Sequence, residues 1–202
     1  ILPIPPDYRL DRWNDDLLPQ IGALALAAHQ DGIEAVAVPE SAGAAVAERL
    51  HSARAGDAAS DRRWHAEASL VALDRGNRVA GYVAVTATPG EATVLDLAVH
   101  PQHRRRGLGR LLLARSMAAC RAAGLAAVTL AVTTRNPARH LADQLGFQPV
   151  TCGEVAIWCW SPGGRIGSKR SEPNSKAPTA SRYTSLSRTS LVPMRRRRFT
   201  AS

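Results

Sequence analysis

The sequence predicts an α+β fold in which a mixed, mostly antiparallel sheet is flanked by helices. Strand-like and helix-like segments follow one another in the order β-α-α-β-β-β-α-β-α-β. Three of the strand-like segments lie between residues 67 and 99 and are separated only by short turns, which favours antiparallel hairpins. Residues 161–202 differ in composition from residues 1–160 and are expected to lie outside the fold.

The N-terminal part is expected to supply one strand and two helices. Residues 8–13 alternate roughly between apolar and polar side chains, as a strand does. Asp15 or Asp16 is expected to cap a helix whose apolar residues recur at helical spacing through Ala28. A second helix is expected to start near Pro39 and to end at Gly56, before a loop over residues 57–63.

The remaining elements are bounded by turn residues. The expected strands cover residues 67–73, 79–88, 92–99, 125–132 and 155–160. After Pro101 the apolar period changes from two to that of a helix, which is expected to run from near Gly107 to Gly124. A shorter helix is expected over residues 137–145, closed by Gly146.

The net charge of +9 belongs to the C-terminal segment alone. Residues 161–202 hold ten basic residues and one acidic residue, Glu172, which leaves sixteen of each in residues 1–160. The same segment holds nine Ser and four Pro, so it cannot bury enough apolar surface to offset its ordering entropy. We therefore expect a neutral domain at 1–160 and a disordered, non-catalytic tail at 161–202, through which alone nucleic acid would bind.

The cysteine content and the apolar runs indicate a cytoplasmic protein. The three cysteines are odd in number and lack metal-ligand spacing, which favours a reducing compartment and predicts no metal site. No apolar run approaches the roughly 20 residues that a membrane span needs. The apolar stretch of residues 21–28 follows Asp15 and Asp16 rather than a basic segment, so it is not expected to be a signal peptide.

The segment of residues 97–110, LAVHPQHRRRGLGR, carries the chemistry. A strand runs into a basic turn that opens a helix, and Gly107 and Gly109 allow a ligand to approach the backbone closely. Unpaired N–H groups and the helix dipole at such a start favour a phosphate. Positive charge comes from Arg104, Arg105, Arg106 and Arg110. The glycine spacing fits neither a nucleoside-triphosphate P-loop nor a dinucleotide-binding turn.

These residues resemble a known family. Arg104-x-x-Gly107-x-Gly109 is similar to the Q/R-x-x-G-x-G/A signature of the GNAT N-acetyltransferases, with Leu-Ala-Val-His-Pro before it and Arg-Leu-Leu-Leu after it. Asn136, followed by Leu145-Gly146-Phe147, resembles the family's second motif. The resemblance covers roughly residues 8–160 and is strongest over residues 91–150.

The resemblance implies the acyl-CoA N-acyltransferase fold and acetyl-CoA as acyl-donor cosubstrate, with no metal. The pyrophosphate would lie on the turn formed by Arg104, Arg105, Arg106, Gly107, Leu108, Gly109 and Arg110. The pantetheine arm would pair with the main chain of Leu97, Ala98 and Val99, where the strand splays from its neighbour, and Asn136 would contact the cosubstrate. A primary amine would then attack the thioester directly in a ternary complex.

The catalytic acid and base are less defined by the resemblance. The family often has a Tyr four residues before the Gly of the LGF motif, but this position is Ala142, so the acid lies elsewhere or water protonates the thiolate. Asp96, directly before Leu97, is the candidate base, and a structural carboxylate paired with an arginine is the alternative reading. Glu91 and His100 are weaker candidates.

Two other functions remain compatible with the sequence. Ala142 motivates a catalytically inactive acyl-CoA-binding or regulatory module, and the basic tail motivates a nucleic-acid-associated protein. For an active enzyme, the sequence leaves open whether the acceptor is a small-molecule or a protein amine. It also leaves open a homodimer.

Overall fold

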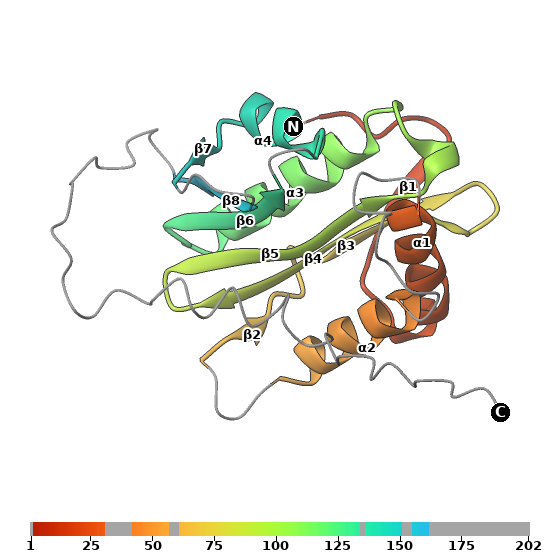
Figure 1. Ribbon diagram of the computed structural model, residues 1–202, viewed down its shortest axis with the longest axis horizontal. Helices are drawn as coiled ribbons and strands as arrows, with labels where there is room; N and C mark the ends of the chain where they lie inside the picture. Colours follow the sequence, from red (N-terminus) through yellow and green to blue (C-terminus); the bar gives the residue numbers. More distant parts are fainter. Residues whose placement is uncertain (1, 31–41, 57–60, 134–135, 151–154, 162–202) are drawn as a thin grey trace, which may run out of the picture. The chain divides into compact units, whose positions relative to one another are not determined.

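A mixed sheet of eight strands runs through the part of the chain that the computed structural model describes, which is residues 2–30, 42–56, 61–133, 136–150 and 155–161. The strands are β1 (Tyr8–Arg12), β2 (Arg63–Trp64), β3 (Leu70–Asp74), β4 (Val79–Thr88), β5 (Glu91–Val99), β6 (Ala127–Thr133), β7 (Gln148–Pro149) and β8 (Val155–Trp160). Their order is β1-β3-β4-β5-β6-β8-β7, with β2 paired to β4 (Figure 1). The predicted α+β class is confirmed.

The sheet is antiparallel except between its two central strands. β5 pairs with β4 over its whole length, from Glu91 opposite Thr88 to Val99 opposite Gly81. With β6 it pairs in parallel and only from Glu91 to Val94. Beyond Val94 the two strands part, so the edge of β5 that faces β6 is left without a strand partner through Val99.

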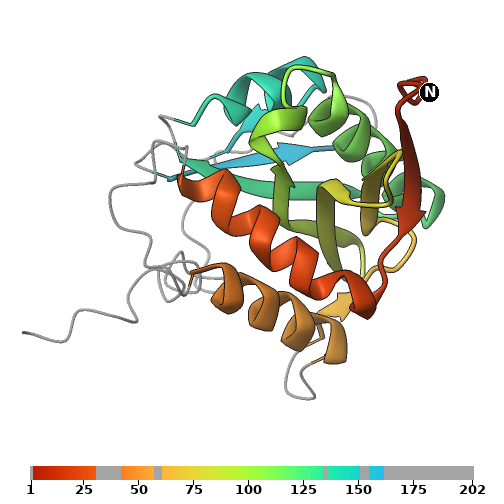
Figure 2. The ribbon, with the colours of Figure 1, turned by 90° about the vertical axis from the view of Figure 1, so that its right-hand side faces the viewer.

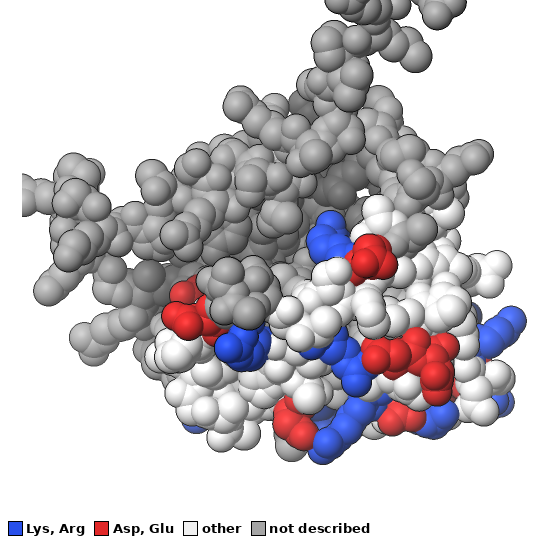
Figure 3. Space-filling view, turned by 90° about the horizontal axis from the view of Figure 1, so that it is seen from below, with Lys and Arg blue, Asp and Glu red and all other residues white. Residues whose placement is uncertain are grey.

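Helices cover both faces of the sheet. They are α1 (Leu18–Gln30), α2 (Ala42–Ala55), α3 (Leu108–Ala122) and α4 (Ala138–Gln144), with 3₁₀ turns η1 (Asp15–Leu17) and η3 (Pro101–His103). Figure 2 shows α1 and α2 side by side on one face, with α3 and α4 across the sheet from them. On the face seen in Figure 3, acidic and basic side chains of the described residues lie next to one another, as expected for a neutral domain.

Strand β4 is buried on both faces and separates two apolar cores. Val83 and Val85 pack in the core that includes Leu112 of α3, and Tyr82 packs in the core that includes Ile21 of α1. The period of two along a strand explains why neighbouring residues enter different cores. It also explains why residues 79–88 read as one continuous apolar run rather than as an alternating one.

Several element boundaries differ from those predicted. Asn14, rather than Asp15 or Asp16, caps the N-terminal helical segment by accepting from the Asp16 amide. Strand β3 begins three residues later than expected because the amides of Ala68 and Ser69 turn back to the carbonyl of His65. The two-residue strands β2 and β7 were not predicted. The expected helix start near Pro39 and the tail over residues 162–202 lie outside the described residues.

Candidate active site

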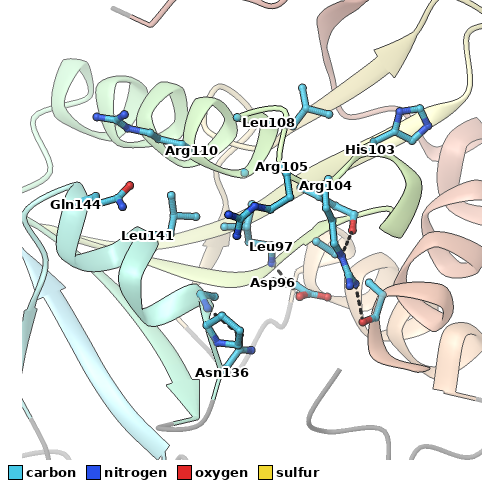
Figure 4. A pocket seen from close by; sticks show the side chains of 17 residues that line it. Asp96, Leu97, His103, Arg104, Arg105, Leu108, Arg110, Asn136, Leu141 and Gln144 are labelled. Carbon is cyan, nitrogen blue, oxygen red and sulfur yellow. Dashed lines mark hydrogen bonds between the residues drawn. The ribbon is translucent and has the colours of Figure 1, made fainter. Parts of the chain in front are cut away.

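A cleft of about 590 Å³ lies where β5 parts from β6. Its walls are the end of β5, the turn that follows it, the first turn of α3, one face of α4 with the residues just before it, and Ala28 of α1 (Figure 4). The structure thus brings together segments that are up to 116 residues apart in the sequence, from Ala28 to Gln144. Asp96 and every residue predicted to bind the cosubstrate, except Arg106, line this cleft.

The unpaired part of β5 forms one wall. Leu97, Ala98 and Val99 all line the cleft, and none of them pairs with β6. Leu97 and Val99 pack against the α3 side of the sheet, whereas Ala98 is buried on the α1 side. An extended ligand with amide groups can therefore lie along this edge and complete its hydrogen bonding, as an additional strand would.

The turn after β5 presents backbone amides to the cleft. Arg105 and Gly107 adopt left-handed conformations, with φ of 63° and 80°. The backbone N–H groups of residues 105–110 make no hydrogen bond to another described residue, and α3 has no side-chain N-cap. A Cβ added to Gly107 would meet nothing within 4 Å. Open space, unpaired donors and the positive end of α3 together make an anion site.

The four arginines of this segment differ in their hydrogen-bond partners. Arg104 donates from Nε to the Val99 carbonyl at 3.3 Å and from Nη2 to the Ala28 carbonyl at 3.0 Å, so its guanidinium lies against α1. Arg106 points away from the cleft. Arg105 and Arg110 line the cleft and have no hydrogen-bond or ion-pair partner among the described residues, which leaves both available for a phosphate (Figure 4).

Arg106 belongs to a cluster that sequence reasoning missed. Its Nη1 donates to the Tyr8 hydroxyl at 3.1 Å, and that hydroxyl lies 2.9 Å from His103 Nδ1. The Tyr8 hydroxyl accepts from Arg106 through one lone pair and keeps both a proton and a second lone pair for its contact with Nδ1, so this contact forms with either tautomer of His103. His103 lines the cleft, and burial is the main cause that lowers its pKa below the usual value. Strand pairing of β1 with β3 brings Tyr8 here, which no local pattern reveals.

Asn136 begins the opposite wall. Its Oδ1 accepts from the amide of Ala138 at 2.9 Å and so stabilises the start of α4, which leaves its amide NH₂ available to a ligand. Leu141 and Gln144 of α4 also line the cleft, although the sequence did not single them out. Ala142, by contrast, is 1% exposed and packs in the core on the α3 side.

Asp96 lies at the end of the cleft where the strands part. Its Oδ2 accepts from the Tyr82 hydroxyl at 2.7 Å, and its Oδ1 accepts from the Leu97 amide at 2.8 Å. Arg49 of α2 forms a longer ion pair, with 3.8 Å between Nη2 and Oδ2. The carboxylate is thus paired with an arginine, as expected if its role is structural. It also lines the cleft, as expected if it is the catalytic base.

The other candidate groups lie elsewhere. His100 accepts from the Gln102 amide through Nδ1 and caps η3, which is a structural position, and Glu91 begins β5 at the far end of the strand from the turn. Within the described residues, no group of three or more His, Cys, Asp or Glu side chains could hold a metal ion. No helix among them is long and apolar enough to cross a membrane.

Comparison with known proteins identifies the family. A model of the Acetyltransferase (GNAT) family matches residues 33–147, more than half of the chain. The chain belongs to this family of acetyltransferases, as the resemblance had indicated. No curated protein sequence matches the chain significantly.

Solved structures confirm the fold. The PaiA N-acetyltransferase of Thermoplasma acidophilum, in complex with coenzyme A, superimposes with a TM-score of 0.61 at 15% identity over 77% of this chain and 99% of that one. The ribosomal-protein-S18-alanine N-acetyltransferase of Escherichia coli gives a TM-score of 0.56 at 21% identity, over 80% and 97%. A GNAT acetyltransferase of Brucella melitensis in complex with acetyl-CoA gives 0.54 at 20% identity, over 79% and 91%.

Proposed function

We propose that this protein is an acetyl-CoA-dependent N-acetyltransferase that moves the acetyl group to a primary amine by direct attack in a ternary complex. The observation that carries this proposal is the continuity of the cleft. An anion site of unpaired amides leads directly into an unpaired strand edge, which ends beside a carboxylate at Asp96. A pyrophosphate, a chain of amides and an ammonium group would meet these three features in that order.

Residues of the cleft suit each part of acetyl-CoA. The amides of residues 105–110 and the guanidinium groups of Arg105 and Arg110 would bind the pyrophosphate. The main chain of residues 97–99 would pair with the pantetheine arm, and the Asn136 amide would donate to it from the other wall. Arg104 would act through the position of the turn, because its guanidinium is already bonded to Val99 and Ala28.

Conversion of an ammonium to an amide removes two protons from the nitrogen, and one proton must reach the leaving thiolate. Asp96 would bind the acceptor ammonium and direct its first proton to water, after which the amine nitrogen attacks the thioester carbonyl carbon. The nitrogen gives its second proton to water as the C–S bond breaks. Within the described residues, the cleft is lined by no tyrosine that could act as acid, and Ala142 is buried. A thiol has an ordinary pKa near 8.5, so the thiolate can leave and take its proton from water.

The acceptor is a small-molecule amine or a protein amine. The Escherichia coli protein of the same fold is named for the alanine of ribosomal protein S18, so a peptide amine belongs among the first acceptors to test. The proposed catalytic unit is residues 1–160, and the tail over residues 161–202 is proposed to take no part in transfer.

Calorimetry with acetyl-CoA tests the cosubstrate. We expect the wild-type protein to bind and Gly107→Glu to lose binding, because a carboxylate would enter the anion site. Gly90→Glu is a matched control, since Gly90 also has a positive φ, 91°, and open space around it but does not line the cleft. Absence of binding, or equal binding by Gly107→Glu, would contradict the proposal.

A thiol-release assay tests transfer itself. The assay uses acetyl-CoA with a panel of primary amines that includes an alanyl peptide, a lysyl peptide and small diamines. We expect release of coenzyme A that depends on one class of amine. Binding of acetyl-CoA without release by any amine would favour the inactive acyl-CoA-binding module, which Ala142 suggests.

A further inference from the structure

We infer that Tyr82 is a positioning residue for acetyl transfer, which holds the Asp96 carboxylate in the orientation that receives the acceptor amine. This inference rests on the proposed function and adds to it a residue outside both sequence motifs. Tyr82 lies on β4, opposite Ala98 of β5, and its ring does not line the cleft. Its only route to the chemistry among the described residues is its hydrogen bond to Asp96.

The ring of Tyr82 is closely packed on the α1 side of the sheet. Tyr82 is 0% exposed and packs in the core that includes Ile21, Leu24 and Leu50. The Trp13 ring meets it edge-on, with 5.8 Å between centroids and 88° between planes. Close packing of this kind holds the ring, and with it the hydroxyl oxygen, in one position.

The hydroxyl of Tyr82 can act only as a donor to Asp96. Burial, followed by the nearby Asp96 charge, raises the pKa of Tyr82 well above its usual value near 10, so the phenol stays protonated. A buried phenol proton needs an acceptor, and Asp96 Oδ2 lies 2.7 Å away. The bond is a short charge-assisted one, which is stronger than a bond between neutral groups.

Two donors at two oxygens fix the plane of the carboxylate. Tyr82 holds Oδ2 and the Leu97 amide holds Oδ1, so rotation of the Asp96 side chain breaks at least one bond. Each oxygen keeps a second lone pair, and Arg49 at 3.8 Å is too distant to fill one as a hydrogen-bond donor. The Asp96 side chain is 14% exposed, which leaves it accessible from the cleft.

The fixed carboxylate lies at the point of reaction. The last β5 residue that pairs with β6 is Val94. Asp96 lies two positions beyond it, in the open edge, and directly precedes Leu97. A β-bulge at this point of β5, between the Ala84–Asp96 and Val85–Val94 pairs, turns the strand locally. An ammonium bound to Asp96 would thus be held beside the strand edge on which the thioester arm would lie.

The variant Tyr82→Phe tests the inference because it keeps the ring and removes only the hydroxyl. With the best amine of the panel, we expect kcat to fall about tenfold, the KM for acetyl-CoA to stay within about twofold and binding of acetyl-CoA to be unchanged. Thr86→Val is the matched control. It removes another buried hydroxyl of β4, one that has no hydrogen-bond partner among the described residues, and should leave kcat and both KM values unchanged.

A double-mutant cycle separates positioning from packing. In the Asp96→Ala background, Tyr82→Phe should cause no further loss beyond about twofold, because the carboxylate that Tyr82 orients is already absent. A full second tenfold loss, or wild-type kcat in Tyr82→Phe alone, would overturn the inference.

If Tyr82→Phe does not fold, Asp96→Glu replaces it as the test, since it keeps the charge and moves the carboxylate away from Tyr82. Full turnover by Asp96→Glu would equally overturn the inference.

Failure of the proposed function gives a different result. In that case the wild-type protein itself releases no coenzyme A with any amine, and both the function and the role of Tyr82 are overturned. If the wild-type protein acetylates an amine and Tyr82→Phe has the same kcat, only the positioning role of Tyr82 is overturned.

Discussion

Arg104 donates to the carbonyl oxygen of Ala28 at 3.0 Å and thereby joins the turn after β5 to the last turn of α1. Carbonyl groups at a helix C-terminus lack helical partners and carry the negative end of the dipole, so a guanidinium there is stabilising. The same side chain also bonds to Val99 at the end of β5. One arginine thus connects the three segments that meet at the mouth of the cleft.

Replacement of Arg104 and of Arg105 should separate stability from ligand binding. We expect Arg104→Gln to lower the free energy of unfolding by about 0.5–1 kcal/mol, because the contact with α1 is solvent-exposed. Arg105→Gln should leave stability unchanged and weaken acetyl-CoA binding about fivefold to tenfold, because Arg105 has no protein partner among the described residues. Urea denaturation measures the first effect and calorimetry the second. A loss of stability in Arg105→Gln without a loss of binding would contradict this division of roles.

Substitution of Gly107 by alanine should strain the backbone. At a φ of 80° a Cβ costs about 1–2 kcal/mol, and here the cost is purely conformational because the added atom meets nothing within 4 Å. Gly90→Ala, at a φ of 91° and also in open space, should cost a similar amount of stability. Only Gly107→Ala should also weaken acetyl-CoA binding. Equal affinity in the two variants would mean that the turn does not bind the cosubstrate.

His103 should make stability depend on pH. Burial lowers its pKa in the folded protein, so the unfolded chain binds a proton at a higher pH than the folded one does. The contribution of His103 to the free energy of unfolding is therefore fully present above the ordinary histidine pKa near 6.5. It is lost as the pH falls through the lower pKa of the folded protein. Urea denaturation from about pH 7 to about pH 5 should show a larger loss for the wild-type protein than for His103→Gln. Parallel curves would contradict this prediction.

Removal of residues 161–202 should leave the cleft intact. The described residues that line the cleft lie between Ala28 and Gln144, so we expect the truncated chain to keep the acetyl-CoA affinity and the urea midpoint of the full chain. Because the removed segment holds ten basic residues and one acidic residue, any salt-dependent binding of the full chain to DNA should disappear. A large loss of acetyl-CoA affinity would show that the proposed domain boundary is wrong.

Local patterns predicted most of the fold. The strand over residues 79–88 was expected with its observed bounds, and α3 was expected within one or two residues of where it lies. The short strands β2 and β7 escaped prediction because two residues carry no readable period and exist only through pairing with β4 and β8. The start of β3 was misplaced because a turn held by His65 interrupts an apolar run that reads as a strand.

The family and the fold class could be predicted from the sequence, and so could the part of the proposed site that lies in one continuous segment, residues 96–110. That segment carries its information locally, because a strand, a glycine-containing turn and a helix start are adjacent in the chain. Tertiary structure decided how its side chains are used. Arg104 meets Ala28, Arg106 meets Tyr8, and Asp96 meets Tyr82, through contacts that depend on strand register and helix docking. Hydrophobic periodicity specifies which face of an element is buried, but it does not specify which polar groups will then be neighbours.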